Sequence, residues 1–311
     1  MYYIVYPLLY VVSLLPFFVL YFISDCTAFL LSNVFKYRKD VVLNNLEIAF
    51  PEKTAAERNA IAKKFYTYFT DTFIETLKFI SISKKQLLKR STGSFELINS
   101  LIDKGYNINI MAGHQFNWEY ANLLYAINIK IPFVGIYTPI SNKVFGKIFY
   151  DMRSRYGTNM ISASDFKKER HDVFKKQYIL ALGADQNPGN PASAYWLNFF
   201  GRPVPFVSGP EKGAVLNNAA VVYVGFKKVK RGCYTFTATL LAEQGACTKP
   251  GELTCLYRDA LEKTIRQDPA NYLWSHRRFK FEWKEAYKDL WVDVPLSSSF
   301  GLQQKGGQSI K

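Results

Sequence analysis

The first 23 residues carry no charged side chain, and this run constrains the chain more than any other feature. They read MYYIVYPLLYVVSLLPFFVLYFI. A helix rises about 1.5 Å per residue, so a helix of this length roughly spans the hydrocarbon core of a bilayer. A cleaved signal peptide would begin with basic residues, whereas this run has no early Lys or Arg and is too long. The run therefore predicts an N-terminal membrane helix.

Two features of this region leave a second arrangement open. Pro7 and Pro16 can kink a helix, and Asp25 is followed by another apolar stretch at 28–35. A re-entrant or interfacial hairpin is therefore the alternative to a spanning helix. Residues 36–39 then read KYRK, and by the positive-inside rule this basic cluster places the body of the protein in the cytoplasm.

Composition narrows the choice of partners. Lys and Arg total 40 against 25 Asp and Glu, a net charge of +15. This excess indicates an acidic partner or surface, such as anionic lipid, an acidic carrier protein or nucleic acid. The chain has no zinc-finger spacing, no RNA-binding aromatic signature and no isolated basic arm, so we expect no nucleic acid partner. Aromatic residues make up 16% of the chain, a surplus that suits a lipid interface as well as a core.

Cysteine and histidine usage indicates neither a disulfide framework nor a metal centre. The four cysteines form no CxxC pair, so we expect no dependence on disulfides. Three histidines leave little material for a His-rich metal site. These residues are Cys26, Cys233, Cys247 and Cys255, and His114, His171 and His276.

The rest of the chain alternates between strand and helix patterns. Apolar residues spaced by three and four over 53–80 predict a helix with one buried stripe, and Thr54 with Glu57 fits a capping box. Strands alternating with helices favour an α/β fold with a mostly parallel central sheet flanked by helices. Strands are predicted at 107–111, 133–137, 160–161, 178–183, 220–226 and 234–241, and further helices at 95–104, 118–126, 143–156, 166–176 and 253–268.

We predict three regions along the chain. Residues 1–35 form the membrane anchor and residues 36–295 the α/β domain. Residues 296–311 are rich in Ser, Gly, Gln and Lys, a composition typical of a disordered tail.

The sharpest chemical signal is the segment GHQFNWE at 113–119, which follows a predicted strand and opens a predicted helix. His114 and Glu119 would lie about 140° apart on one helix, so they can pair only if His114 lies in the loop and Glu119 in the first helical turn. The carboxylate would then fix the ring tautomer while the other ring nitrogen takes a proton from a hydroxyl. The chain has no GxSxG motif, which favours direct attack by the acceptor over an acyl-enzyme. A cap at a helix start is the structural alternative.

With this motif in place, the chain resembles the lipid A late acyltransferases, the lauroyl/myristoyl transferase family of Gram-negative bacteria. The resemblance covers nearly the whole chain, and it depends on the order and spacing of several blocks. These blocks are NLEIAFPEK (45–53), GHQFNWE (113–119), MRSRYGTNMIS (152–162), ADQNPG (184–189), YWLNFFGRP (195–203) and YLWSHRRFK (272–280). The chain departs from the family pattern at SGPEK (208–212), which leaves donor and acceptor detail open.

The resemblance implies a fold like that of glycerolipid acyltransferases and assigns roles by position. His114 and Glu119 match the family's His-x4-Asp/Glu dyad as base and orienting acid. Arg155, with Arg153 as the alternative, matches an Arg that contacts substrate phosphate or the developing oxyanion. Asp185 matches the Asp of the family's D-Q/H motif at a strand end, although an Asx turn explains an Asp there equally well.

Further residues of these blocks are candidates for binding substrate phosphate or an anionic surface. They are Arg153, Gln186, Arg277, Arg278 and Lys280. A solvated basic face is the alternative for the cluster at 277–280, and His276 fits a structural role better than a catalytic one.

The implied activity is transfer of a fatty acyl chain from acyl-carrier protein to a hydroxyl of a lipid A precursor at the cytoplasmic face of the bacterial inner membrane. This activity requires no metal or bound cofactor. Three alternatives stay open. In the first, the acceptor is another membrane lipid, such as an amino-acid lipid or a lysophospholipid. In the second, the protein is a hydrolase with a metal held by His114, Glu119 and Asp185. In the third, the protein is a non-catalytic membrane-binding scaffold.

Overall fold

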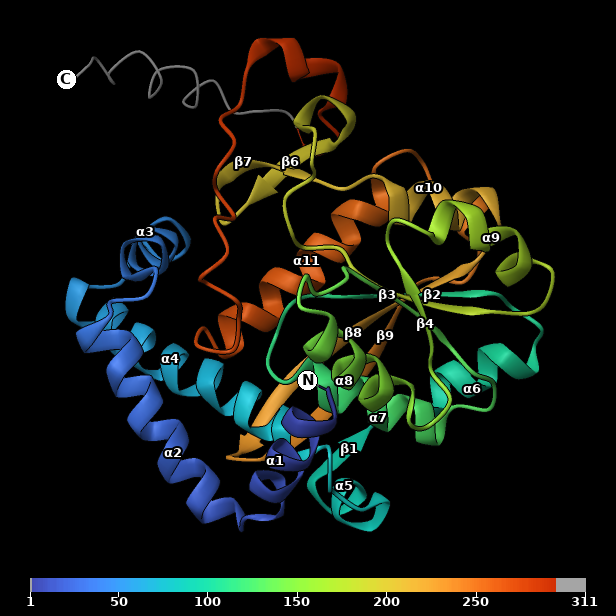
Figure 1. The fold of residues 1–311 in the computed structure, drawn as a ribbon. Coiled ribbons are helices and arrows are strands. Elements are labelled where there is room, and N and C mark those ends of the chain that lie inside the picture. Colours follow the sequence, from blue (N-terminus) through green and yellow to red (C-terminus); the bar gives the residue numbers. More distant parts are fainter. Residues whose placement is uncertain (1, 295–311) are drawn as a thin grey trace.

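A seven-stranded sheet with helices on both faces organises residues 2–294, the part of the chain that the computed structural model describes (Figure 1). The strand order is β1-β9-β8-β2-β5-β3-β4, and every neighbouring pair is parallel except β8 with β9. The predicted α/β fold with a mostly parallel sheet is confirmed. The strands are β1 (Ser91–Gly93), β2 (Ile108–Ala112), β3 (Val134–Tyr137), β4 (Asn159–Ser162), β5 (Ile179–Gly183), β8 (Ala220–Lys230) and β9 (Cys233–Ala242).

The helices that were predicted over the domain are all present. α4 begins after Thr54, whose side chain forms the predicted capping box with Glu57. Short elements that were not predicted include α3, α5, α10, β1 and the two-stranded hairpin of β6 (Tyr195–Phe199) and β7 (Arg202–Phe206). The helices of the domain are α3 (Lys39–Ala49), α4 (Ala55–Lys78), α5 (Lys84–Arg90), α6 (Glu96–Asp103), α7 (Trp118–Asn128), α8 (Lys143–Ser154), α9 (Phe166–Phe174), α10 (Gly209–Leu216) and α11 (Glu252–Gln267).

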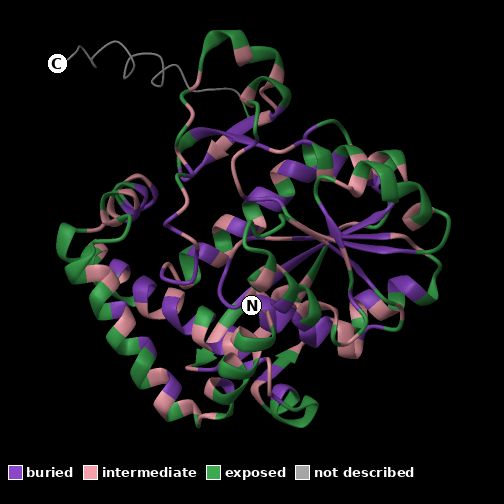
Figure 2. Cartoon of the chain, viewed as in Figure 1, coloured by how far each residue is buried: buried purple, intermediate pink, exposed green. Residues whose placement is uncertain are grey.

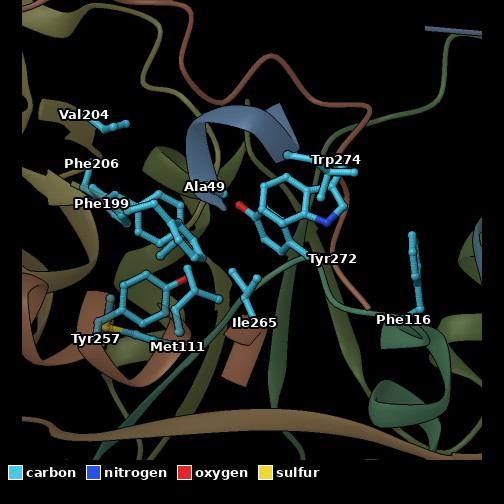
Figure 3. Packing of buried hydrophobic residues seen from close by; sticks show 14 of the residues in the cluster. Ala49, Met111, Phe116, Phe199, Val204, Phe206, Tyr257, Ile265, Tyr272 and Trp274 are labelled. Carbon is cyan, nitrogen blue, oxygen red and sulfur yellow. The ribbon is translucent and has the colours of Figure 1, made fainter. Parts of the chain in front are cut away.

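Alternate residues of β8 separate two hydrophobic cores. Val222 and Val224 belong to the core that includes α6 and α7, whereas Val221 and Tyr223 belong to the core on the α11 side. This division follows from the period of two in a strand, which points successive side chains to opposite faces. The second core is dominated by aromatic side chains (Figure 3), among them Phe199, Phe206, Tyr257, Tyr272 and Trp274.

The N-terminal apolar run is a pair of helices rather than the single helix predicted over 1–23. α1 (Tyr2–Leu14) and α2 (Phe17–Phe29) are separated at Pro16, and a π-helical turn (Leu30–Val34) extends α2. Pro16 has no backbone N–H, and its ψ of 150° lies outside the helical region, so the chain breaks between the two helices there. Among the described residues, the stretch Phe17–Val34 is one helix long and apolar enough to cross a membrane by length and composition. The predicted tail at 296–311 lies outside the described residues.

A buried carboxylate ties α4 to the end of β8. Asp71 of α4 is fully buried and pairs with Lys228 at 2.9 Å and with Arg231 at 2.7 Å. Because Lys228 is itself buried, removing its partner leaves a positive charge without compensation. We expect Asp71→Ala to lower the free energy of unfolding by about 3–5 kcal/mol, measured by urea denaturation.

A matched control for this change is an exposed ion pair. Asp103 pairs with Lys130, and both side chains are more than half exposed. Asp103→Ala should change the unfolding free energy much less, since water replaces the lost contact. Equal effects of the two substitutions would contradict the role assigned to Asp71.

Candidate active site

A cavity of about 580 Å³ opens at the carboxyl ends of β2, β3 and β5. This edge is where open α/β sheets place their ligands. Most of its lining is apolar, including Ile110, Phe133, Val224 and Phe226. The strongly polar side chains that line it are His114, Glu119, Asn122, Thr138, Arg153 and Gln186.

His114 and Asp185 form a close polar contact at this cavity. His114 lies in the loop after β2, and Asp185 lies just after β5, the parallel neighbour of β2. The ring Nδ1 of His114 lies 2.6 Å from Oδ1 of Asp185, and its backbone N–H donates to Oδ2 at 3.0 Å. Two bonds to one carboxylate fix both the loop and the ring. Nε2 has no hydrogen-bond partner among the described residues, and the His114 side chain stays 29% exposed.

The contact shifts the pKa of both groups. Burial alone would raise the pKa of Asp185, but the nearby His114 and its hydrogen bonds lower it to about 2. Burial alone would lower the pKa of His114, but the Asp185 carboxylate outweighs it and raises the pKa above the usual 6.5. Asp185 therefore stays ionised at neutral pH and favours protonation of the imidazole.

Glu119 does not make the predicted hydrogen bond to His114. Its side chain is 3% exposed and accepts bonds from Nε of Arg153 at 3.0 and 3.1 Å, from Nη2 of Arg153, and from Nε1 of Trp118 at 3.1 Å. The expected placement of His114 in the loop and Glu119 in the first turn of α7 is confirmed. The pairing is wrong because Arg153 of α8 occupies the Glu119 carboxylate and Asp185 occupies Nδ1.

Of the two candidate arginines, Arg153 lines the cavity. Arg155 instead donates from Nη1 to the carbonyl oxygens of Phe79 and Ile82, both at 3.0 Å, and fixes the segment that follows α4. Two residues along a helix correspond to about 200° of rotation, so the two side chains leave α8 on opposite sides. The structure thus reverses the preference for Arg155 over Arg153.

The remaining predicted binding residues do not come together. Gln186 lines the cavity, while Arg277 and Lys280 are exposed elsewhere. Arg278 is fully buried, donates to Asn187 Oδ1 and to the Pro205 carbonyl, and stacks on Phe206. Arg278 is thus held inside the protein and does not line the cavity, and its predicted binding role stays a prediction.

Two asparagines that were not predicted as site residues hold the loop between β2 and α7. Asn271 accepts from the Phe116 N–H at 2.9 Å and donates to the Phe226 carbonyl at 3.0 Å. Asn117 caps α7 by accepting from the Glu119 N–H at 3.0 Å, and its amide donates to Glu75. An Asn directly before an apolar helix is a recognisable cap signal, whereas nothing local marked Asn271.

Gly183, at the end of β5, leaves the space that the His114 ring occupies. A Cβ at this position would lie 2.9 Å from Cε1 of His114. We expect Gly183→Ala to displace the ring and to lower kcat by roughly ten-fold or more, because small misplacements of a reacting group are costly. Steady-state kinetics measures the loss, and circular dichroism should show an unchanged fold. Gly189→Ala is the control, since a Cβ there meets no atom within 4 Å.

The structure also bears on the metal hypothesis. Among the described residues, no three His, Cys, Asp or Glu side chains are grouped so that they could hold one metal ion. The trio of His114, Glu119 and Asp185 is therefore not assembled as a ligand set, because Glu119 is turned toward Arg153.

Comparisons with known proteins identify the family to which the chain is similar. Residues 1–281 match the family model described as bacterial lipid A biosynthesis acyltransferase. The lipid A biosynthesis palmitoleoyltransferase of Escherichia coli (strain K12) is 23% identical over 278 residues, covering 86% of each chain. The lipid A biosynthesis lauroyltransferase of the same strain is 23% identical over 278 residues, covering 88% of this chain and 89% of that one. A lipid A biosynthesis acyltransferase of Shigella flexneri is also 23% identical, again over 86% of each chain.

Proposed function

Because the chain belongs to the family of bacterial lipid A biosynthesis acyltransferases, we propose that it moves a fatty acyl chain from an acyl-carrier-protein thioester to a hydroxyl of a lipid A precursor. The chain is an acyltransferase of lipid A biosynthesis. The base, the donor and the side of the membrane are the finer parts of the proposal. The contact between His114 and Asp185 at the mouth of an apolar cavity carries it.

In the proposed reaction His114 is the general base. Asp185 holds Nδ1, so Nε2 is the nitrogen left to take the proton of the acceptor hydroxyl. The hydroxyl oxygen bonds to the thioester carbonyl carbon, and a tetrahedral oxyanion forms. When this intermediate collapses the C–S bond breaks, and the His114 imidazolium returns the proton to the departing thiolate. No acyl-enzyme forms on this route.

Arg153 is suited to stabilise negative charge on the substrate. Its Nε and Nη2 bond to Glu119, and its Nη1 has no hydrogen-bond partner among the described residues. We assign Glu119 the task of aiming this guanidinium into the cavity, where it contacts the oxyanion or a substrate phosphate. Glu119 thus supports the reaction through Arg153 rather than through direct contact with His114.

The net charge of +15 supports the choice of donor. Acyl-carrier protein is acidic, and opposite net charges speed encounter between two proteins. The protein is membrane-associated, as its family and its apolar N-terminal helices indicate. We place the catalytic domain at the cytoplasmic face of the inner membrane, because the basic cluster at 36–39 beside the apolar run suits the anionic lipids of the cytoplasmic leaflet.

Mass spectrometry of the reaction products tests the proposal. Purified full-length protein, an acyl-carrier-protein thioester and a lipid A precursor should yield one added acyl group on the precursor. Parallel reactions use a coenzyme A thioester as donor and a lysophospholipid as acceptor. Acylation of the lysophospholipid alone would overturn the acceptor, and transfer from coenzyme A alone would overturn the donor.

A further inference from the structure

The outer surface of the α1–α2 hairpin is a wide apolar face. Seven of its large side chains are at least 61% exposed, and Figure 2 shows exposed positions recurring along α2. An exposed apolar patch of this kind marks an interaction surface. The seven side chains are Tyr3, Ile4, Leu8, Val11, Phe18, Phe22 and Phe29.

The inner surface of α2 is bound to the catalytic domain by polar contacts. Leu20, Ser24 and Ala28, one turn apart, are buried. Ser24 Oγ donates to Asp71 at 2.8 Å, and the hydroxyl of Tyr21 donates to Glu75 at 2.9 Å. Both carboxylates belong to α4, which runs alongside α2 (Figure 1). The inner face of α2 therefore packs against protein and not against lipid.

Contacts with the catalytic domain continue to both ends of the hairpin. At the turn between α1 and α2, the guanidinium of Arg90 lies 3.6 Å from the ring centroid of Phe17. Lys78 donates to the carbonyl oxygens of Ser13 and Leu15 at 2.7 and 3.0 Å.

The far end of α2 is held in the same way. The hydroxyl of Tyr66 donates to the carbonyl of Tyr37 at 2.7 Å, and Arg38 donates to the carbonyl of Ser275 at 2.9 Å. A spanning helix would carry one of its ends to the opposite side of the bilayer. The stretch Phe17–Val34 is about 26 Å long, and the catalytic domain touches it from end to end.

We propose that α1 and α2 do not cross the membrane but lie in its plane, so that the outer face of the hairpin docks the enzyme on one leaflet. This arrangement keeps every polar contact of the inner face and buries the apolar side chains in lipid. One face of the hairpin then lies against the protein and the other in the lipid of one leaflet. The choice of lipid as the partner rests on the proposed function, since the acceptor is itself a membrane lipid.

The charges around the hairpin fit a single leaflet. Lys36 and Arg38 are exposed beyond the end of α2, and Lys84, Lys85 and Lys89 are exposed on α5, whose last residue stacks on the hairpin turn. Basic side chains thus lie at both ends of α2. Anionic headgroups of one leaflet can bind both groups at once, whereas a spanning helix would separate them by the bilayer.

The docking face also leads toward the active site. The hydroxyl of Tyr2 donates to Asp151 of α8 at 3.3 Å, which sets the start of α1 beside the helix that carries Arg153. Phe145 and Tyr150 of α8 are exposed as well. A lipid acceptor in the same leaflet therefore reaches the cavity without leaving the membrane surface.

Depth measurements with nitroxide labels distinguish the two topologies. Phe18→Cys, Phe22→Cys and Phe29→Cys are made one at a time in a full-length chain whose four native cysteines are alanine. Each labelled protein is bound to vesicles of phosphatidylethanolamine and phosphatidylglycerol. The three positions share one face of α2, so a helix in the plane gives three equal depths. A spanning helix separates positions 18 and 29 by about 16 Å along its axis.

Equal depths below the headgroups support the proposal, and a steady gradient of depth along α2 overturns it. Labels that all stay in water also overturn it and indicate a protein partner for this face. Leu216→Cys on α10, where Leu216 is 82% exposed, is the reference for a label in water. These measurements need no turnover, so they are independent of the outcome of the acyl-transfer assay.

A charge substitution gives a second, functional test. Phe22→Glu should weaken vesicle binding by roughly ten-fold or more, because it replaces a lipid-buried ring with a charge. Leu216→Glu is the matched control and should bind vesicles as the unaltered chain does. Activity on detergent-dispersed acceptor should survive Phe22→Glu. Unchanged vesicle flotation of this variant would contradict the docking face.

Discussion

Replacing His114 by alanine is expected to lower kcat by about 10²–10⁴-fold, the usual contribution of a positioned general base. The buried Asp185 carboxylate holds Nδ1 of this ring at the cavity, and Nε2 has no hydrogen-bond partner among the described residues. Without the imidazole the acceptor hydroxyl must lose its proton to water. The KM for the acyl donor should change little, since the ring acts on the acceptor. Initial rates with acyl-carrier-protein thioester and lipid acceptor measure both parameters.

Two controls separate loss of the base from loss of the fold. His171, exposed on α9, carries the same side chain away from the cavity, and His171→Ala should keep full activity. His114→Asn retains a hydrogen-bond donor toward Asp185 without a base of comparable pKa, so it should be folded and inactive. A folded His114→Ala protein with more than half of the original kcat would exclude His114 as the base.

The sequence predicted the sheet and the long helices because their patterns are local. The stripe of α4 and its capping box are contained within 54–78, and each buried strand is a short apolar run. The β6–β7 hairpin was missed because Pro203 and Pro205 lie within β7 and read as strand breakers. A two-stranded ribbon tolerates them, since an edge strand has N–H positions that face away from its partner.

The partner of His114 was beyond local reasoning for a different reason. Seventy-one positions separate it from Asp185, and their contact exists because β5 inserts beside β2 in the sheet. Both residues were identified as candidates, but the strand order that joins them is not written in either motif. Glu119 is the nearer carboxylate along the chain, but Arg153 of α8 bonds to it in the folded protein. The roles of all four residues stay predictions.

The contact between His114 and Asp185 makes Asp185 important for turnover as well. In Asp185→Asn the carboxylate that fixes the Nδ1–H tautomer and stabilises the imidazolium is lost, and kcat should fall by on the order of 10²–10⁴-fold. An equivalent change in a Ser-His-Asp triad costs about 10⁴-fold. Loss of kcat alone does not identify the cause, because Asp185 is also buried and structural. The pH dependence of the residual activity identifies the cause.

The sign of the pH effect follows from the pKa of His114. A base must be neutral, so kcat/KM rises with pH as His114 loses its proton, with a midpoint above 6.5 in the unaltered enzyme. Asp185 is what raises this pKa, while burial opposes it. In Asp185→Asn burial acts alone, and the acid limb of the profile should move to lower pH.

Glu119→Gln provides the comparison that decides which carboxylate orients His114. Glu119 bonds to Arg153 and not to the imidazole, so this variant should lose activity through a misplaced guanidinium while its acid limb keeps the original midpoint. Arg153→Lys should reproduce that loss, because a single ammonium cannot replace the fork that bridges Glu119 and substrate. If the midpoint moves in Glu119→Gln and stays fixed in Asp185→Asn, then Glu119 swings to His114 during turnover and the contact with Asp185 belongs to the resting enzyme alone.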